Sequence, residues 1–400
     1  MLAVLGGVVS GILAALFLGL LERVNHLFQL NPILVVGLPI AGCFGYVIFS
    51  RYGLGVEAGT SLILQVFHGR REAIPFRMAP MVLWGTLLSH FFGGSVGREG
   101  TAVQVSVGAM VGGSRWMGIG TDWNQTLVAC GIAGGFGAVF GTPWAGAMYA
   151  VEMPVLGVLQ WRYVPFCIIS SQIGNWVCLA CGVTHSEYPQ IGSVDYTSAL
   201  FWCRLGIAGC VFGCCARIFI ILVRDIGRIS TRIGLSGISR VLAISCAVVL
   251  LGTIGGMQGY LGLGVEALNP ALPSLLGSFS HGGVSDWSWL WKLVLTALTL
   301  AAGFRGGELT PLFFVGAAIG NSVASLLGCP VDYLAALGMA AVFFGACHSP
   351  IAGCIMGIEL FGIELAAPLF LVCLISDRVC SGISLYPDQM FKSNVQLELR

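Results

Sequence analysis

The sequence predicts an all-α membrane protein built from two repeats of inverted topology, with broken and tilted helices. The composition, a duplicated series of motifs and the placement of arginines support this prediction. Hydrophobic residues make up 56% of the chain and charged residues only 9%. A soluble domain carries about 25% charged residues, so this chain has too few charges to build a water-facing surface.

Long apolar stretches predict the membrane-embedded elements. They lie at about 2–21, 33–49, 79–92, 126–151, 164–183, 199–223, 241–256, 289–304, 311–328, 334–347 and 350–376. Several reach the ~20 residues needed to span a bilayer. Others are shorter or are interrupted by Gly, Pro or a lone Glu, which is typical of transporter helices that stop within the membrane. The first stretch lacks a preceding basic region and a small-residue cleavage site, so we expect a retained helix.

Two parts of the chain repeat each other. The string Gly-Leu-Gly-Val-Glu-Ala occurs at 53–58 and again at 262–267, and the spacing from Glu57 to Glu99 equals that from Glu266 to Glu308. A further series recurs at one constant offset: Gly131, Phe136, Pro143, Gly146 and Glu152 match Gly338, Phe343, Pro350, Gly353 and Glu359. In a membrane protein, such duplication predicts two repeats that face each other across a site near the midplane.

The arginines predict the orientation of the repeats. Arg224, Arg228, Arg232 and Arg240 cluster in one connection, which we expect to be cytoplasmic, whereas 182–198 has no Lys or Arg and should be external. We therefore expect a first membrane repeat at 1–182, an external linker at 183–198, an inverted second repeat at 199–390 and a short cytoplasmic tail at 391–400. An external linker with both chain ends inside requires each half to cross an odd number of times.

Other function classes lack support in the sequence. The net charge is +1 and no basic tract is long enough to follow phosphates, so we expect no nucleic-acid partner. The CxxC at Cys178 and Cys181 has no second pair to complete a metal site, and we predict packing cysteines and no cofactor. No Ser–Lys, GxGD or HExxH set occurs on the apolar segments, so we expect a protein that is not an enzyme.

The chemistry is expected at two glutamates in glycine-rich strings. Glu99 follows Gly93, Gly94 and Gly97 at a predicted helix start, where free backbone N–H groups and the helix dipole attract an anion. A carboxylate there can occupy the anion site and leave when it is protonated or displaced. The alternative is a glutamate that only caps its helix.

Glu308 repeats this design. It follows Gly306 and Gly307, precedes Pro311, which suits a first helical turn, and lies near the hydroxyl donor of Thr310. The strings 53–56 and 262–265 predict two further helix starts, and four such starts predict an anion site between broken helices. We expect Glu152 and Glu359 to cap or pair locally near an interface, and Tyr149 and His348 to pack rather than to relay protons.

The motifs resemble those of the CLC family of chloride channels and proton-coupled anion antiporters. The residues Gly97, Arg98, Glu99 and Gly100 match the family string GREGP; Phe140, Pro143 and Gly146 match GxFxxPxxGxxFxxE; and 306–311 lies at GGIFAP. The resemblance implies a homodimer in which each subunit has its own pore and an anion site. It places Gly97, Arg98, Gly100, Gly307, Leu309 and Thr310 at that site.

Departures from the family strings resemble its fluoride-selective bacterial branch. Thr101 replaces a proline, Glu308 an isoleucine and Thr310 an alanine. The resemblance then implies that Glu99 is the gating glutamate, Glu308 a second coupling glutamate and Thr310 the hydroxyl that binds the ion. Met153 stands where chloride antiporters have their internal proton glutamate, so another proton route is required.

Two family positions stay open at this point. The place of the central serine falls either on Leu54 and Gly55, by string similarity, or on Ala58, by spacing, and the C-terminal tyrosine corresponds to Tyr386. The resemblance implies a multi-pass protein of the bacterial inner membrane that exports fluoride in exchange for protons. The alternative is a chloride-selective antiporter or passive anion channel.

Overall fold

The computed structural model describes residues 1–192, 194 and 196–391, and its architecture is almost entirely helical. The first half contains α1 (Leu2–Leu30), α2 (Leu38–Tyr52), α3 (Thr60–Phe67), α4 (Met78–Phe91), α5 (Glu99–Gly113), α6 (Asn124–Phe140), α7 (Pro143–Glu152) and α8 (Val164–Ala180). The second contains α9 (Ala199–Arg232), α10 (Gly237–Thr253), α11 (Ser288–Ala302), α12 (Leu309–Leu327), α13 (Val331–Cys347), α14 (Pro350–Phe361) and α15 (Ala366–Val379). The predicted all-α class is confirmed.

Five of these segments are long and apolar enough to cross a membrane. They are Leu2–Leu30, Pro32–Tyr52, Trp161–Ala180, Ala199–Arg232 and Leu309–Leu327. The other apolar helices are shorter, as the interrupted stretches predicted. The chain is therefore a membrane protein in which long helices surround short ones that end inside the fold.

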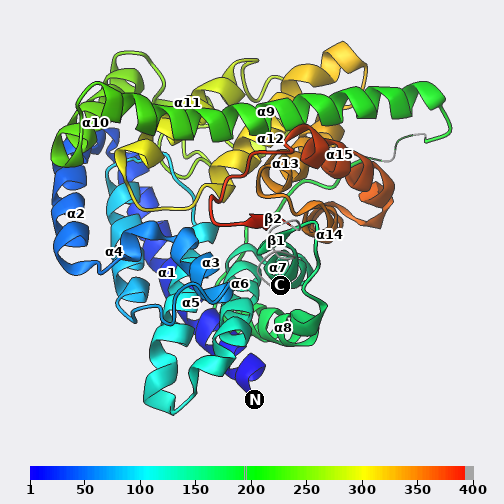
Figure 1. Cartoon of the computed structure of the whole chain (residues 1–400). Coiled ribbons are helices and arrows are strands. Elements are labelled where there is room, and N and C mark those ends of the chain that lie inside the picture. Colours follow the sequence, from blue (N-terminus) through cyan, green and yellow to red (C-terminus); the bar gives the residue numbers. More distant parts are fainter. Residues whose placement is uncertain (193, 195, 392–400) are drawn as a thin grey trace.

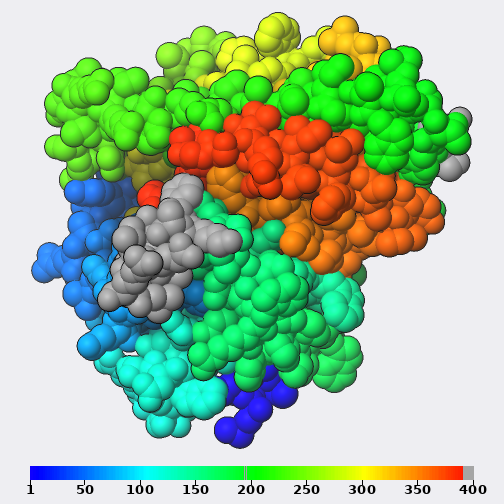
Figure 2. All heavy atoms as spheres, turned by 45° about the vertical axis from the view of Figure 1, so that its right-hand side comes forward, coloured from blue at the N-terminus to red at the C-terminus, as the bar shows by residue number. Residues whose placement is uncertain are grey.

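The two halves form two layers. In Figure 1 the first half lies below and the second above, with the long α9 running along the top of the molecule. Figure 2 shows the same division, with the second half resting on the first along a continuous seam. The helices α5, α6 and α7 correspond by their motifs to α12, α13 and α14, and α7 packs against α14 across the seam. The fold is therefore that of two inverted repeats.

Two predicted stretches are each divided into two helices. The stretch 126–151 breaks between α6 and α7, where Gly141 has φ +77° and Pro143 begins the next helix. The stretch 350–376 breaks between α14 and α15 at Gly362, with φ +100°. A positive φ ends an α-helix and a proline cannot continue one. Hydrophobicity alone therefore predicted helices that are too long at these two places.

Small residues allow the inner helices to approach closely. An added Cβ on Gly316 of α12 would collide with the carbonyl of Gly338 of α13, and the reverse is also true. Glycine contacts of this kind let helix backbones touch in membrane proteins, where packing replaces the hydrophobic effect. They keep α12 against α13 and fix the direction in which the N-terminus of α12 points.

Two glutamates join the halves by capping each other's helices. The carboxylate of Glu152, at the end of α7, accepts hydrogen bonds from the N–H groups of Ile351 (3.1 Å) and Ala352 (2.8 Å) at the start of α14. Glu359, in α14, accepts from Trp144 (3.0 Å) and Ala145 (2.7 Å) at the start of α7. The predicted local capping is confirmed, and it is reciprocal. Because a carboxylate satisfies free N–H groups and interacts favourably with the helix dipole, these four hydrogen bonds hold the seam together.

The end of the second half returns to the first. A short strand, β2 (Met390–Phe391), pairs in parallel with β1 (Val155–Leu156) just after α7. The strand ties segment 381–389 across the seam. Apart from its first residue, the predicted cytoplasmic tail at 391–400 lies outside the described residues.

Candidate functional site

Two helix N-termini meet at the centre of the fold. The helix α5 begins at Glu99 and α12 at Leu309, as predicted. Just before them Gly97 and Gly307 form an antiparallel bridge, in which the N–H of Gly307 donates to the carbonyl of Gly97 at 2.8 Å and the N–H of Gly97 donates back. A Cβ on Gly97 would lie 2.7 Å from the Thr310 hydroxyl oxygen, so only glycine permits this approach.

The carboxylate of Glu99 does not cap its own helix but lies at the N-terminus of α12. Its Oε2 accepts hydrogen bonds from the backbone N–H of Thr310 at 3.1 Å and from the Thr310 hydroxyl at 2.5 Å. Its Oε1 accepts from Nε of Arg98 at 3.3 Å, and the residue is fully buried. A negative group thus occupies a set of donors directed at one point, which is the arrangement of an anion site.

Thr310 connects the two helix starts. Its hydroxyl oxygen accepts a hydrogen bond from the backbone N–H of Arg98 at 3.2 Å and donates its proton to Glu99. A hydroxyl has one proton to donate, so this donor is occupied while Glu99 is in place. If Glu99 leaves, the hydroxyl and the N–H of Thr310 are both available to a small anion.

A chain of polar side chains continues from this point. Glu308 is the residue that precedes α12, and Glu308 and Tyr386 line the same cavity. The Tyr386 hydroxyl in turn lies 3.1 Å from that of Tyr149, and both tyrosines are buried. The structure therefore brings Glu308 and Tyr386 together as expected. Tyr149 was predicted to pack rather than to relay protons, and its contact with Tyr386 was not predicted. The only sequence signal of that contact was a hydroxyl within the apolar α7.

Two cavities end on either side of Glu99. A cavity of about 610 Å³ is lined by Ala58, Gly59, Thr60, Arg305, Glu308 and Tyr386, and also by Arg240. A second cavity of about 540 Å³ is lined by Glu22, His26, Arg98, His185 and Glu266. Because Arg98 borders one cavity and Glu308 the other, the Glu99 carboxylate lies between them. The arrangement resembles a pore closed by one side chain.

The second part of the repeated string at 53–58 lines the larger cavity. Ala58 and Gly59 line the larger cavity, whereas Leu54, which is 68% exposed, and Gly55 are outside that lining. Gly55 and Gly59 have φ values of +90° and +56°, and α3 begins only after Gly59. The positive φ values delay the helix, so the structure does not support Leu54 and Gly55 as anion ligands.

The matching string at 262–265 does not start a helix in the described chain. Gly262 and Gly264 have φ values of +63° and +74°, and a series of bends and turns follows. The carbonyls of Gly262 and Leu263 accept hydrogen bonds from the buried Nζ of Lys292 at 2.9 and 3.4 Å. The prediction of a fourth helix start was wrong, because these backbone groups bind a lysine rather than continue as a helix.

Comparison with known proteins identifies the family. The family model described as voltage gated chloride channel matches residues 41–381. The chain belongs to the CLC family. A chloride/fluoride channel protein of Pseudomonas syringae pathovar tomato is 35% identical over 396 residues, which cover 97% of this chain and 85% of that protein. The H(+)/Cl(−) exchange transporter ClcA of Salmonella typhi is 27% identical and covers 89% and 77% of the two chains.

Solved CLC structures agree with this fold. The crystal structure of a CLC-type fluoride/proton antiporter superposes with a TM-score of 0.92 and 31% identity, over 98% of this chain and 97% of that one. The structure of a slow cyanobacterial Cl−/H+ antiporter gives a TM-score of 0.77 at 18% identity, over 100% and 96%, and shows the fold alone. The predicted CLC fold of inverted repeats is confirmed, and the chain is a CLC-type anion and proton transporter.

Proposed function

We propose that this protein exports fluoride in exchange for protons. The observation that carries the proposal is the Glu99 carboxylate held at the N-terminus of α12 by the N–H and hydroxyl of Thr310. These groups form a small, buried pair of donors that an anion and a carboxylate can use in turn. The fluoride/proton antiporter and the chloride/fluoride channel protein found above support the choice of ion.

The exchange of Glu99 for an anion couples the two fluxes. While the ionised carboxylate is bound to Thr310 it closes the path between the cavities. When Glu99 takes up a proton it loses its charge and its affinity for the positive end of α12, so an anion can take its place. Each departure of Glu99 therefore carries a proton in the direction opposite to the anion.

Fluoride suits the donor set at Thr310. Fluoride is small and strongly hydrated, so a site must replace its water with short, well-directed donors. A hydroxyl and a backbone N–H on the same residue provide such donors within one helical turn. A protonated Glu308 can donate a third hydrogen bond, whereas an ionised Glu308 repels the anion. Fluoride binding and protonation of Glu308 are then linked.

A flux comparison tests the choice of ion. Purified protein in liposomes is loaded with equal concentrations of sodium fluoride and sodium chloride, and the efflux of each anion is recorded with ion-selective electrodes. We expect fluoride efflux to exceed chloride efflux and to be accompanied by proton uptake. Equal or faster chloride efflux would instead favour the alternative, a chloride-selective antiporter or channel.

We also propose that 1–182 and 199–390 are the two membrane repeats, that 183–198 is external, and that the protein is a homodimer of the bacterial inner membrane. The larger cavity, which is lined by Arg240, then opens to the cytoplasm, and the smaller one, which is lined by His185, opens outside. Arginines resist transfer across the membrane.

Single-cysteine labelling tests the proposed orientation. In a protein freed of its native cysteines, a cysteine at position 187, where the native Glu187 is exposed, should react with an impermeant maleimide in intact cells. A cysteine at position 232 should react only after the membrane is permeabilised. Labelling of position 232 in intact cells would overturn the orientation, and a reporter cysteine in a known periplasmic loop controls for reagent access.

A further inference from the structure

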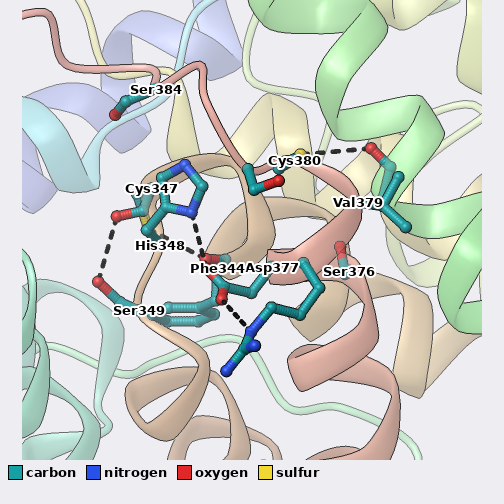
Figure 3. A network of polar contacts seen from close by, with 12 residues as sticks. Phe344, Cys347, His348, Ser349, Ser376, Asp377, Val379, Cys380 and Ser384 are labelled. Atoms are coloured by element: carbon teal, nitrogen blue, oxygen red, sulfur yellow. Dashed lines mark hydrogen bonds and ion pairs between the residues drawn. The ribbon is translucent and has the colours of Figure 1, made fainter. Parts of the chain in front are cut away.

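A buried histidine and a half-buried aspartate form a polar pair close to the segment that carries Tyr386. His348 follows the end of α13 with φ +55°, an uncommon value for a residue other than glycine. Figure 3 shows its ring directed at Asp377 of α15. The Nδ1 atom lies 2.7 Å from Oδ1 of Asp377, and the Nε2 atom lies 2.7 Å from the carbonyl oxygen of Ile383.

The geometry of the ring requires an extra proton. A backbone carbonyl only accepts hydrogen bonds, so Nε2 must carry a hydrogen. A neutral imidazole would then face the Asp377 carboxylate with the lone pair of Nδ1, and two acceptors at 2.7 Å repel each other. The contact forms when one more proton lies between the two groups, either on His348 or on Asp377. The pair is therefore one proton-binding unit.

This unit holds the segment that carries Tyr386. His348 binds Ile383, three residues before Tyr386. The N–H of Leu385 donates to the carbonyl of Ala346, two residues before His348, at 3.1 Å. On the far side of Tyr386, Nε2 of Gln389 donates to the carbonyl of Cys347 at 2.9 Å. Residues 346–348, at the end of α13, thus support both sides of Tyr386, which lines the larger cavity together with Glu308.

We propose that His348 and Asp377 are positioning residues that hold Tyr386 against Glu308 while they share a proton drawn from the cytoplasmic side. The unit is accessible to water, because the side chain of Asp377 is 18% exposed and that of His348 is 8% exposed. Its role in transport rests on the proposed function, whereas its proton binding does not. When the proton is lost, His348 no longer attracts Asp377 and the support of segment 383–387 weakens.

The surroundings of the pair set the sign of the pH dependence. The charged and titratable groups that face it are Arg378, Cys373 and Cys380 on α15, Cys347 beside His348, and Glu152 of α7. Nε of Arg378 lies 3.8 Å from Oδ2 of Asp377 and is largely exposed. The contact exists only with the proton bound, so its stabilisation is present at lower pH and is lost as the cytoplasmic pH rises.

Two variants and a matched control test this proposal. Asp377→Asn keeps the shape of the side chain, and His348→Gln keeps a hydrogen-bond donor, but neither pair can share a titrating proton as the histidine and carboxylate do. His281→Gln removes an exposed histidine elsewhere and serves as the control. In the wild type, we expect anion efflux and the thermal midpoint to fall as the pH on the cytoplasmic side rises from 6 to 9. Both variants should lose the pH dependence of the thermal midpoint and show a flatter pH profile of efflux, to which Glu99 and Glu308 still contribute. Their efflux at low pH should drop about fivefold.

Tyr386→Phe separates positioning from a general structural role. If His348 acts through Tyr386, anion efflux in the double variant His348→Gln with Tyr386→Phe should be no slower than in the slower of the two single variants. Independent, multiplying effects would overturn the proposal, as would an unchanged pH profile in both single variants. Efflux is measured with whichever anion the wild type transports, so failure of the fluoride assignment is distinguished from failure of this inference.

A measurement on the wild type remains decisive if a variant fails to fold. Protein labelled with ¹⁵N-histidine should show one histidine that keeps both ring nitrogens protonated at neutral pH, unless its proton lies on Asp377. Infrared difference spectra over the same pH range then report a protonated carboxyl. Absence of both signals would show that no proton is shared and would contradict the proposal.

Discussion

Glu99→Gln is expected to abolish proton-coupled transport. The amide has nearly the shape of the protonated carboxyl, but it cannot take up or release a proton in a cycle. It also lacks the charge that holds Glu99 at the N-terminus of α12. Anion flux should therefore either stop, if the amide still fills the site at Thr310, or continue without proton movement. Simultaneous recording of anion efflux and proton uptake in liposomes distinguishes these outcomes.

A second glutamate provides the control for this experiment. Glu152 is also buried, but its carboxylate caps α14 and lies away from the two helix starts at the site. Glu152→Gln should lower stability and leave the ratio of protons to anions unchanged. If Glu99→Gln vesicles still drive protons uphill under a fluoride gradient, Glu99 is not the coupling residue.

Thr310→Ala is expected to weaken fluoride binding with a smaller effect on larger anions. The change removes one hydroxyl donor from a buried site, which costs about 1–3 kcal/mol. At about 1.4 kcal/mol per factor of ten, that cost corresponds to roughly a 5- to 150-fold loss of apparent fluoride affinity. Larger anions should lose less affinity, because they are less strongly hydrated and depend less on this donor. The apparent affinity is read from initial fluoride efflux as a function of fluoride concentration.

Glu308→Ala should change both the fluoride-to-chloride flux ratio and the proton coupling, because Glu308 precedes α12 and lines the same cavity as Tyr386. Thr126→Ala serves as the control, since Thr126 is buried in α6 and lies outside the two cavities described here. If Thr310→Ala and Glu308→Ala both keep the fluoride-to-chloride ratio and the proton coupling of the wild type, the two residues are structural caps. The fluoride assignment would then rest on the family relationship alone.

The sequence predicted the two central helix starts well, because local rules govern them. Glycines followed by a glutamate and a helical pattern placed the starts of α5 and α12 at the right residues, Glu99 and Leu309. The repeat itself showed that two such starts belong together. What it could not show is that the carboxylate of Glu99 reaches across to Thr310, because that contact depends on how the two halves are docked.

The sequence was less informative where the two copies diverge or where contacts cross the seam. The strings at 53–58 and 262–267 are identical, yet a short helix begins after the first and bends and turns follow the second. The buried Lys292, which belongs to another element, binds the second string. Likewise, the local sequence around Tyr149 and His348 predicts that both side chains only pack. Their partners, Tyr386 and Asp377, lie in segments that only the folded chain brings near.

Fluoride/proton antiport is tested most directly by measuring whether a fluoride gradient drives protons into liposomes. Liposomes with equal pH inside and outside are loaded with fluoride, diluted into fluoride-free buffer and clamped at zero membrane potential with valinomycin and potassium. We expect protons to enter and acidify the lumen as fluoride leaves. An equal chloride gradient should produce much less acidification. Fluoride efflux without any proton entry in the wild-type protein would contradict fluoride/proton antiport.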